Sequence, residues 1–187
     1  HLTKEGCFFR VWAPHAEQVR VLLQSGTRWR FDAERRAAPL ESDGHGYWSA
    51  TLPEVAPGTL YRFEITHKGN VSERLDPAAR DVVHSALTQH DGNSDNASIV
   101  VENKPYPWAA FKTPPFENFL IYQFHVGSFA GRHDEFDKPI ATFRDVEAKF
   151  DYIRSLGFNA IQPLPVQEFA FDRSWGYNPA AFFAPES

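Results

Sequence analysis

The sequence predicts an immunoglobulin-like, all-β sandwich followed by the first βαβ unit of an incomplete (β/α)8 barrel. Three observations support this fold class. Alternating apolar and polar residues in the N-terminal half indicate antiparallel strands that bury one face. A proline-rich segment then interrupts the pattern. Beyond it, two continuous apolar runs flank a helical pattern, which is typical of a parallel sheet covered by helices.

The predicted sandwich consists of short strands separated by turn-forming residues. Val19, Val21 and Leu23 alternate with mostly polar neighbours, and segments 47–52 and 60–65 repeat this period-two pattern. Gly, Pro, Asn and Ser occupy the connections, where backbone turns need them. Several short strands at this spacing favour two packed antiparallel sheets.

Prolines mark the predicted boundary between two domains. A strand at residues 99–101 is expected to close the sandwich. The next segment contains four prolines, at positions 105, 107, 114 and 115. Because proline cannot donate a hydrogen bond to a central ladder, this segment is interpreted as a semi-rigid linker. The predicted domains are therefore the sandwich at 1–103, the linker at 104–118 and the barrel fragment at 119–187.

The βαβ pattern begins with an apolar run at 119–124, which is expected to form a strand buried on both faces. Thr142 and Asp145 have the spacing of a helix capping box, and Gly157 can end the helix in the left-handed conformation. The second strand is predicted at 158–164 and should run parallel to the first. The helix between them would carry one apolar stripe, made of Phe143, Val146, Phe150, Ile153 and Leu156.

A single βαβ unit cannot cover both faces of its own sheet. The chain ends roughly a quarter of the way round a barrel of ordinary size. We therefore expect a barrel truncated after its second strand, with uncovered apolar surface that favours self-association.

Composition and charge exclude several classes of function. The formal net charge of -5 and the pI near 5.9 argue against nucleic acid as the main partner. No apolar run is long enough to span a membrane. Cys7 is the single cysteine and the eight histidines lack the spacing of zinc ligands, so neither a disulfide framework nor a metal site is expected. No cofactor is expected either, and these features favour a cytoplasmic protein.

Aromatic residues make up 15% of the chain, although its mean hydropathy is only -0.45. Such residues either fill the core of a sandwich or stack on flat ligands such as sugar rings. Trp12 and Trp48 are assigned to the core.

Five segments in a fixed order carry a resemblance that covers nearly the whole chain. They are FRVWAP at 9–14, LDPAAR at 75–80, IYQFHVGSF at 121–129, LGFNAIQPLPVQEF at 156–169 and SWGYNPAAFFAPES at 174–187. Together they resemble glycoside hydrolase family 13, the α-amylase family, with an N-terminal family 48 carbohydrate-binding module. The chain is most similar to glycogen branching enzymes or maltooligosyl-trehalose hydrolases.

The resemblance implies the N-terminal part of an α-glucan-active enzyme, most like a 1,4-α-glucan branching enzyme. The family uses an Asp nucleophile, a Glu acid/base and a second Asp in a retaining double displacement. The family places these residues on later strands, so no catalytic residue is expected in this fragment, which should be inactive alone. Within the family, a trehalose-releasing hydrolase or an isoamylase-type debranching enzyme shares nearly all these motifs. A non-catalytic carbohydrate-binding or scaffold protein is the alternative from another class.

The resemblance also implies candidate contacts with an α-glucan. Tyr177 matches the position of a tyrosine that stacks on the sugar, although it could instead be a packed loop residue. Trp175 and Asn178 are its neighbours, and their alternative roles are packing and turn formation. In the sandwich, Trp29 and Arg62 are expected on the outer surface, where they could bind glucan.

Other polar residues are assigned structural rather than functional roles. Glu168 and Asp172 form a carboxylate pair, but the resemblance gives them no catalytic role and Arg173 can neutralise Asp172. His125 is interpreted as a hydrogen-bonded core histidine. The dipeptide Asn70-Val71 stands where glycogen-binding modules of this family usually carry a second tryptophan, which weakens the prediction of glucan binding by the sandwich.

Overall fold

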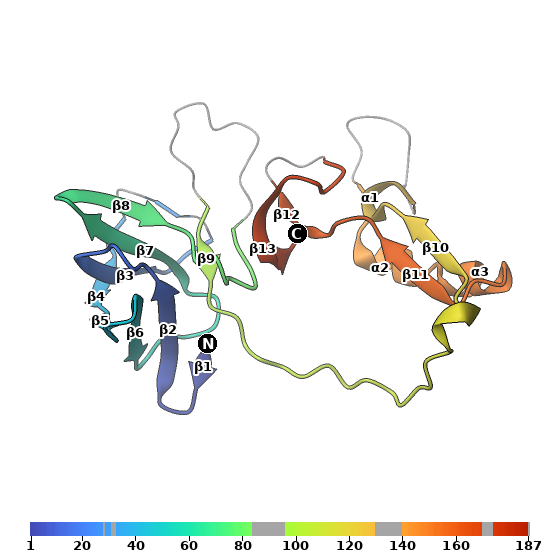
Figure 1. Ribbon diagram of the computed structural model, residues 1–187, viewed down its shortest axis with the longest axis horizontal. Coiled ribbons are helices and arrows are strands. Elements are labelled where there is room, and N and C mark those ends of the chain that lie inside the picture. The colour runs from blue at the N-terminus through green and yellow to red at the C-terminus, as the bar shows by residue number, and fades with distance from the viewer. Residues whose placement is uncertain (28, 31–32, 84–95, 130–139, 170–173, 187) are drawn as a thin grey trace. The chain divides into compact units, whose positions relative to one another are not determined.

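The computed structural model describes residues 1–27, 29–30, 33–83, 96–129, 140–169 and 174–186 (Figure 1). Its contacts divide the chain into two compact units. Unit 1 comprises His1–Pro105, Gln167–Asp172 and Pro179–Ser187, and unit 2 comprises Tyr106–Val166 and Arg173–Asn178. The first boundary between the units thus falls inside the proline-rich segment.

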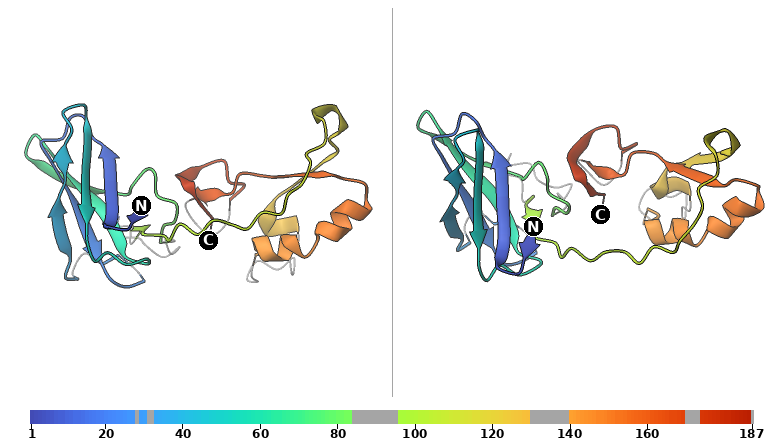
Figure 2. Two further views of the ribbon diagram at one scale, coloured as in Figure 1. Left: turned by 90° about the horizontal axis from the view of Figure 1, so that it is seen from below. Right: turned by 60° about the horizontal axis from the view of Figure 1, so that its bottom comes forward.

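In the described part of residues 1–105, two antiparallel sheets form the two layers of a sandwich (Figure 2). In the first sheet the strand order is β1 (Leu2–Thr3), β2 (Gly6–Trp12), β6 (Tyr47–Leu52) and β5 (Glu41–Ser42). In the second it is β4 (Arg36–Pro39), β3 (Gln18–Gln24), β7 (Leu60–His67) and β8 (Asn70–Arg74), and β9 (Ser98–Ile99) also pairs with β7. The strands predicted from period-two patterning are therefore confirmed.

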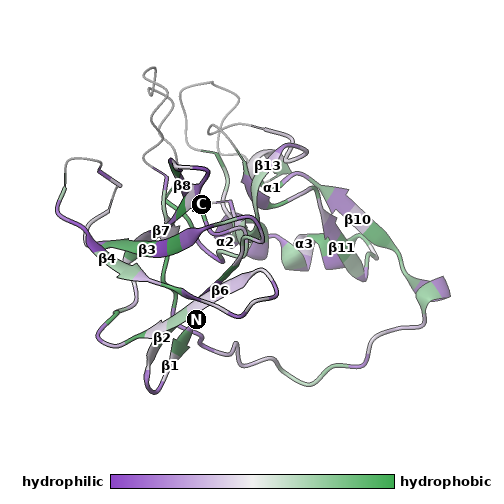
Figure 3. Cartoon of the chain, turned by 60° about the vertical axis from the view of Figure 1, so that its left-hand side comes forward, coloured by the Kyte–Doolittle hydropathy of each residue, from purple (hydrophilic) through white to green (hydrophobic). Residues whose placement is uncertain are grey.

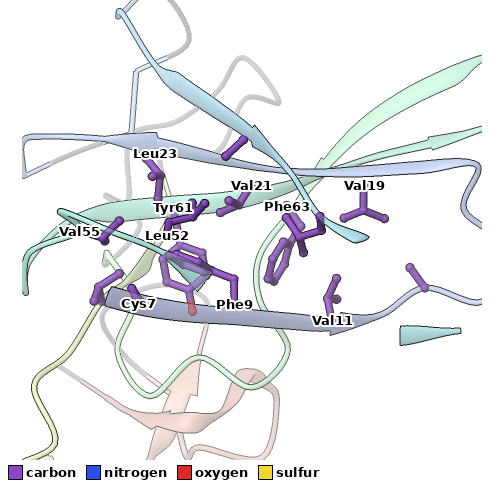
Figure 4. Packing of buried hydrophobic residues seen from close by; sticks show 14 residues of the cluster. Cys7, Phe9, Val11, Val19, Val21, Leu23, Leu52, Val55, Tyr61 and Phe63 are labelled. Carbon is purple, nitrogen blue, oxygen red and sulfur yellow. The ribbon is translucent and has the colours of Figure 1, made fainter. Parts of the chain in front are cut away.

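The core of the sandwich lies between these sheets (Figure 4). Val19 and Val21 of β3 and Phe63 of β7 are fully buried there. The ring of Phe9 on β2 meets the ring of Tyr61 on β7 edge-on, with 5.1 Å between centroids. Because alternate residues of a strand point to opposite faces, the period-two pattern places these side chains on the inner face. Hydrophobic and hydrophilic bands follow one another along β3 (Figure 3).

The assignment of Trp12 to the core is wrong, because its side chain is 62% exposed. Phe9 and Val11 of β2 point inward, so Trp12, at the opposite parity, points outward. Trp48 is half-buried and packs against the core, and its indole N–H donates to the carbonyl oxygen of Ala13 at 3.1 Å.

Unit 2 contains a parallel pair of strands with helices between them in sequence. β10 (Ile121–Phe124) pairs with β11 (Ala160–Pro163). A 3-10 helix, η1 (Phe116–Asn118), precedes β10. α1 (Val126–Phe129), α2 (Phe143–Glu147) and α3 (Phe150–Ser155) lie between the two strands in the sequence.

The predicted helix start is confirmed, but the helix is divided into α2 and α3. A capping box joins Thr142 and Asp145, in which the Thr142 N–H donates to the Asp145 carboxylate at 2.8 Å. The Thr142 hydroxyl donates to the same carboxylate at 2.8 Å. Gly157 has φ +92, as expected for a left-handed helix stop. In the predicted apolar stripe, Val146 and Ile153 are buried. The remaining stripe residues, Phe143, Phe150 and Leu156, are between 44% and 50% exposed.

The prediction that the first strand is buried on both faces is wrong for this chain. Phe124 is 8% exposed, but Ile121 is 47% exposed and Leu120, which precedes the strand, is 58% exposed. Ile161 of β11 is 43% exposed. Two strands with short helical segments provide too little apolar surface to cover both faces of the pair.

Pro179–Pro185 form β13, which pairs antiparallel with β12 (Gln167–Phe169) and which no period-two pattern had indicated. Ala181 and Ala184 of β13 are buried against Ala79 and Val82 of unit 1. Because of these apolar contacts, the β12–β13 hairpin belongs to the same compact unit as the sandwich and not to the unit that contains β10 and β11.

The segment 101–115 contains neither helix nor strand. Several of its aromatic side chains are exposed, and Trp108 and Phe111 reach 80% exposure. The rings of Tyr106 and Trp108 contact each other with 4.5 Å between centroids.

We predict that Tyr61→Phe lowers the free energy of unfolding of unit 1 at neutral pH. As the pH rises into the alkaline range, the variant should lose less of this free energy than the wild type. The Tyr61 hydroxyl donates to the Asp76 carboxylate at 2.7 Å, and losing such a bond costs about 1–2 kcal/mol. Burial, and then the charge of Asp76, raises the pKa of Tyr61 above its ordinary value. The unfolded chain therefore loses this proton first, so the stabilisation is complete below pH of about 10 and falls as pH rises.

Urea unfolding of the wild type and of Tyr61→Phe at neutral and alkaline pH measures this difference. The gap in unfolding free energy between the two proteins should shrink in alkali. A gap that stays constant with pH would contradict the prediction, since the other titrating groups are common to both proteins.

Candidate functional site

Two aromatic side chains that were predicted to contact sugar are exposed in unit 2. Trp175 and Tyr177 are each 71% exposed, and Asn178 is exposed as well. They lie in a turn closed by Ser174, whose hydroxyl accepts a hydrogen bond from the Gly176 N–H at 3.1 Å. The same hydroxyl donates to the side-chain oxygen of Asn178. Both rings therefore project from a short, internally bonded turn.

Gly176 allows this turn to approach the chain near β11. Its φ is +83, and an added Cβ would overlap the carbonyl oxygen of Pro165. A residue with a side chain would be strained at this φ and would clash with Pro165. Gly176 is thus a positioning residue that the sequence analysis did not single out, although a glycine between two aromatic residues was a usable signal.

His125 ties the end of β10 to this turn. Its Nε2 atom lies 2.8 Å from the carbonyl oxygen of Ser174. Because a carbonyl oxygen can only accept, Nε2 carries the proton in this arrangement. The imidazole also meets the ring of Trp175 edge-on, with 5.8 Å between centroids. His125 is therefore hydrogen-bonded as predicted, but it is half-buried rather than part of a core.

The expected surface position of Trp29 and Arg62 is wrong. Trp29 is 2% exposed and Arg62 is 6% exposed. Trp29 packs with Leu22 and Leu60 in a second apolar cluster, which Val83 and Ala97 complete. Arg62 is on the same face of β7 as Leu60, so this cluster covers the face that sequence patterning assigned to solvent.

Polar contacts hold the Trp29–Arg62 pair in place. The Trp29 indole N–H donates to the Glu73 carboxylate at 3.2 Å. Arg62 donates through Nε to the carbonyl oxygen of Asn96 at 2.7 Å and lies 3.6 Å from Glu73. The guanidinium of Arg62 lies 5.1 Å from the centre of the Trp29 ring, within reach of a cation–π interaction. Arg35 also pairs with Glu73, at 2.6 Å.

The carboxylate pair considered near the loop is only partly described. Glu168 is 2% exposed within β12. Asp172 and Arg173 lie outside the described residues. Among the residues that the structure describes, no cluster of His, Cys, Asp and Glu has the geometry of a metal site. None of the described helices is both long and apolar enough to cross a bilayer.

Unit 1 also contains a cavity of about 370 Å³ beside β2 and β7. Its wall combines aromatic residues, Phe8 and Tyr61, with charged ones, Arg10, Asp76 and Arg80. A cavity of this size and mixed polarity can hold a small polar ligand.

The chain is similar to known proteins over both of its units. Residues 1–79 match the family described as Carbohydrate-binding module 48 (Isoamylase N-terminal domain). The chain is 32% identical to the 1,4-alpha-glucan branching enzyme GlgB of Gloeobacter violaceus, over 97% of this chain and 25% of that protein. It is 33% identical to GlgB of a Shewanella species (strain MR-4), over 97% of this chain and 24% of that protein. The chain thus spans about a quarter of the length of these relatives.

Solved structures resemble the chain along its length. A putative alpha amylase from Salmonella typhimurium matches with a TM-score of 0.70 and 28% identity, over 96% of this chain and 26% of that one. The Group B Streptococcus pullulanase SAP matches in fold with a TM-score of 0.79 and 23% identity, over 99% of this chain and 28% of that one. The family resemblance expected from the five sequence segments is therefore confirmed.

We predict that Gly176→Ala opens the turn at 174–178. The added methyl group would overlap Pro165 and require a φ that costs roughly 1 kcal/mol or more for alanine. Amide hydrogen exchange of residues 174–178 should accelerate, whereas exchange in β3 and β7 should not change. Gly58→Ala serves as a matched control, because Gly58 also has a positive φ, +84, but open space around its Cβ position. Equal effects of the two substitutions on their local exchange would contradict the role assigned to Pro165.

A second prediction tests the burial of Trp29. Trp29→Ala removes a fully buried indole and should lower the free energy of unfolding of unit 1 by about 3 kcal/mol or more. Trp108→Ala, at a side chain that is 80% exposed, should leave it within about 0.5 kcal/mol. Urea denaturation followed by circular dichroism measures both. A small effect at Trp29 would mean that this indole is at the surface after all.

Proposed function

We propose, on the premise that residues 1–79 belong to the family 48 carbohydrate-binding modules, that this chain is the N-terminal part of a glycoside hydrolase family 13 enzyme acting on α-glucans. The reaction that we propose for the whole protein is 1,4-α-glucan branching. One observation carries this proposal: branching enzymes match the chain at 32–33% identity over 97% of its length, across both units. A shared binding module alone would match only the sandwich.

We propose that residues 119–187 are the beginning of the catalytic (β/α)8 barrel and that 104–118 link it to the sandwich at 1–103. The parallel pairing of β10 with β11 supports this assignment, since a barrel of this type is built from parallel strands joined through helices. The exposed apolar side chains of Leu120, Ile121 and Ile161 also support it, because further strands and helices would cover them.

In the proposed enzyme, the turn at 174–178 contacts the substrate. It follows β11 in the sequence and, through His125, is bonded to the end of β10. Active sites of such barrels form at the carboxyl ends of the strands. Tyr177 and Trp175 present aromatic faces that can stack on the C–H face of a glucose ring, and Asn178 can hydrogen-bond to a hydroxyl.

The proposed reaction cleaves an α-1,4 bond and transfers the released glucan to a 6-hydroxyl. A retaining mechanism needs a carboxylate nucleophile and a carboxylic acid about 5 Å apart. We place both on later barrel strands, outside residues 1–187. The fragment is therefore inactive alone, and its contribution to the whole enzyme is to bind and orient the glucan.

The test is the activity of the whole protein on amylose. Branching converts α-1,4 into α-1,6 linkages without net hydrolysis, which proton NMR of the product measures together with the yield of reducing ends. New reducing ends without α-1,6 linkages would indicate a hydrolase of the same family. The absence of both products would favour a non-catalytic glucan-binding protein and overturn the proposal.

Tyr177→Ala in the whole protein should reduce kcat/KM by about fivefold, since stacking is worth about 1 kcal/mol. Trp108→Ala is the control, because the Trp108 side chain is also aromatic and highly exposed but lies in the linker. Equal activities of Tyr177→Ala and the wild type would remove Tyr177 from the substrate site.

We also propose that the isolated chain self-associates through the apolar surface of β10 and β11. Ile161→Lys places a charge on this surface and should shift sedimentation velocity profiles towards the monomer. Val71→Lys is the control, since Val71 is 61% exposed on β8 of unit 1. If the wild type sediments as a monomer at a concentration of order 100 µM, where even a weak dimer would be populated, this proposal is contradicted.

A further inference from the structure

On the outer face of the first sheet of the sandwich, two aromatic side chains are exposed next to each other. Trp12 of β2 is 62% exposed, and Tyr47 of β6, its partner in register, is 39% exposed. The backbone N–H and C=O of Tyr47 are bonded to Asp43, at 3.1 Å and 2.9 Å, rather than to β2. The two residues therefore form a non-hydrogen-bonded pair, in which facing side chains are closest.

The indole of Trp12 is held by the turn that precedes β6. Gly46 has φ +93, and a Cβ added to it would lie 3.0 Å from Nε1 of Trp12 and 3.0 Å from Cβ of Pro14. The indole thus packs with its nitrogen edge along the turn, while most of its surface stays open to solvent. An aromatic side chain, which has only two torsions, loses little conformational entropy when a ligand stacks on it.

Charged groups are held beside the two rings. The guanidinium of Arg10 lies 3.9 Å from the centre of the Tyr47 ring and 3.9 Å from the Asp43 carboxylate. Hydrogen bonds from the backbone, first that of His45, hold the pKa of Asp43 below its usual value. A guanidinium donor and a carboxylate acceptor therefore lie beside the Tyr47 ring, which is the cross-strand neighbour of Trp12.

Phe8, Arg10 and Trp12 are alternate residues of β2 and so point to one face of the sheet. Phe8 and Arg10 also line the cavity of about 370 Å³ in unit 1, on whose wall Asp76 and Arg80 add further polar groups. The row formed by Phe8, Arg10 and Trp12 spans about 13 Å along the strand. It leads from the Trp12 indole to the cavity.

We propose that Trp12, Arg10 and this cavity form an α-glucan contact on the sandwich. The proposal rests on the proposed function for the identity of the ligand. A glucose ring stacks on the Trp12 indole, and Arg10 and Asp43 bond its hydroxyls. The next residues of the glucan follow the row along β2 into the cavity, whose volume is in the range of small-ligand sites.

The test uses the 187-residue chain with maltoheptaose as the probe. In proton–nitrogen NMR spectra, Trp12→Phe identifies the indole N–H signal of Trp12 by its disappearance. We expect maltoheptaose to shift this signal in the wild type, whereas the Trp108 indole signal stays in place. Cellohexaose, which has the same rings in β-linkage, should shift the Trp12 signal less.

Affinity measured by calorimetry provides a second readout. Trp12→Ala and Arg10→Ala should each weaken maltoheptaose binding by about fivefold or more. Trp108→Ala is the control, because the Trp108 indole is even more exposed than that of Trp12, and this variant should bind like the wild type. If Trp12→Ala does not fold, the wild-type NMR titration still decides, because it needs no substitution at the site beyond the assignment.

The proposal is overturned if the Trp12 signal does not move at saturating maltoheptaose, or if only the Trp175 signal moves. It is also overturned if the two alanine variants bind as tightly as the wild type. These outcomes leave the proposed enzyme intact, since its test is the formation of α-1,6 linkages by the whole protein. Conversely, a shift at Trp12 in a protein without branching activity would support a glucan contact on a non-catalytic module.

Discussion

Packing on both faces of β7 is the constraint on which unit 1 depends. Tyr61 and Phe63 face the core between the sheets, whereas Leu60 and Arg62 face the cluster around Trp29. The same strand pairs with β3 and β8 along its sides and with β9 near its start. A strand in this position can bury a charged residue only if that charge is compensated, and Glu73 and the Asn96 carbonyl compensate Arg62.

The burial of Trp29 and Arg62 changes where a glucan could bind. Their side chains stabilise the second sheet from outside, so they do not offer a ready surface to sugar. The open aromatic surface of the sandwich lies on the other sheet instead, at Trp12 and Tyr47. In unit 2, the corresponding open aromatic surface is the turn with Trp175 and Tyr177, whose shape depends on Gly176 and His125.

Local patterns predicted several elements of this chain. Alternation at Val19, Val21 and Leu23 identified β3, and the Thr142–Asp145 capping box identified the start of α2. Such signals depend on neighbours within a few residues, which the sequence displays directly. Position within the fold was harder to predict, because Trp29 is buried against Val83 and Ala97, which come much later in the chain.

The sequence by itself determined the main strands of the sandwich, the two apolar runs on either side of a helical segment, and the match of residues 1–79 to the family described as Carbohydrate-binding module 48. Only the tertiary structure decided which aromatic residues are accessible, since it buried Trp29, exposed Trp12 and paired residues 179–185 as a strand. The physical reason is that periodicity distinguishes the two faces of a strand, whereas exposure depends on which distant segments cover each face.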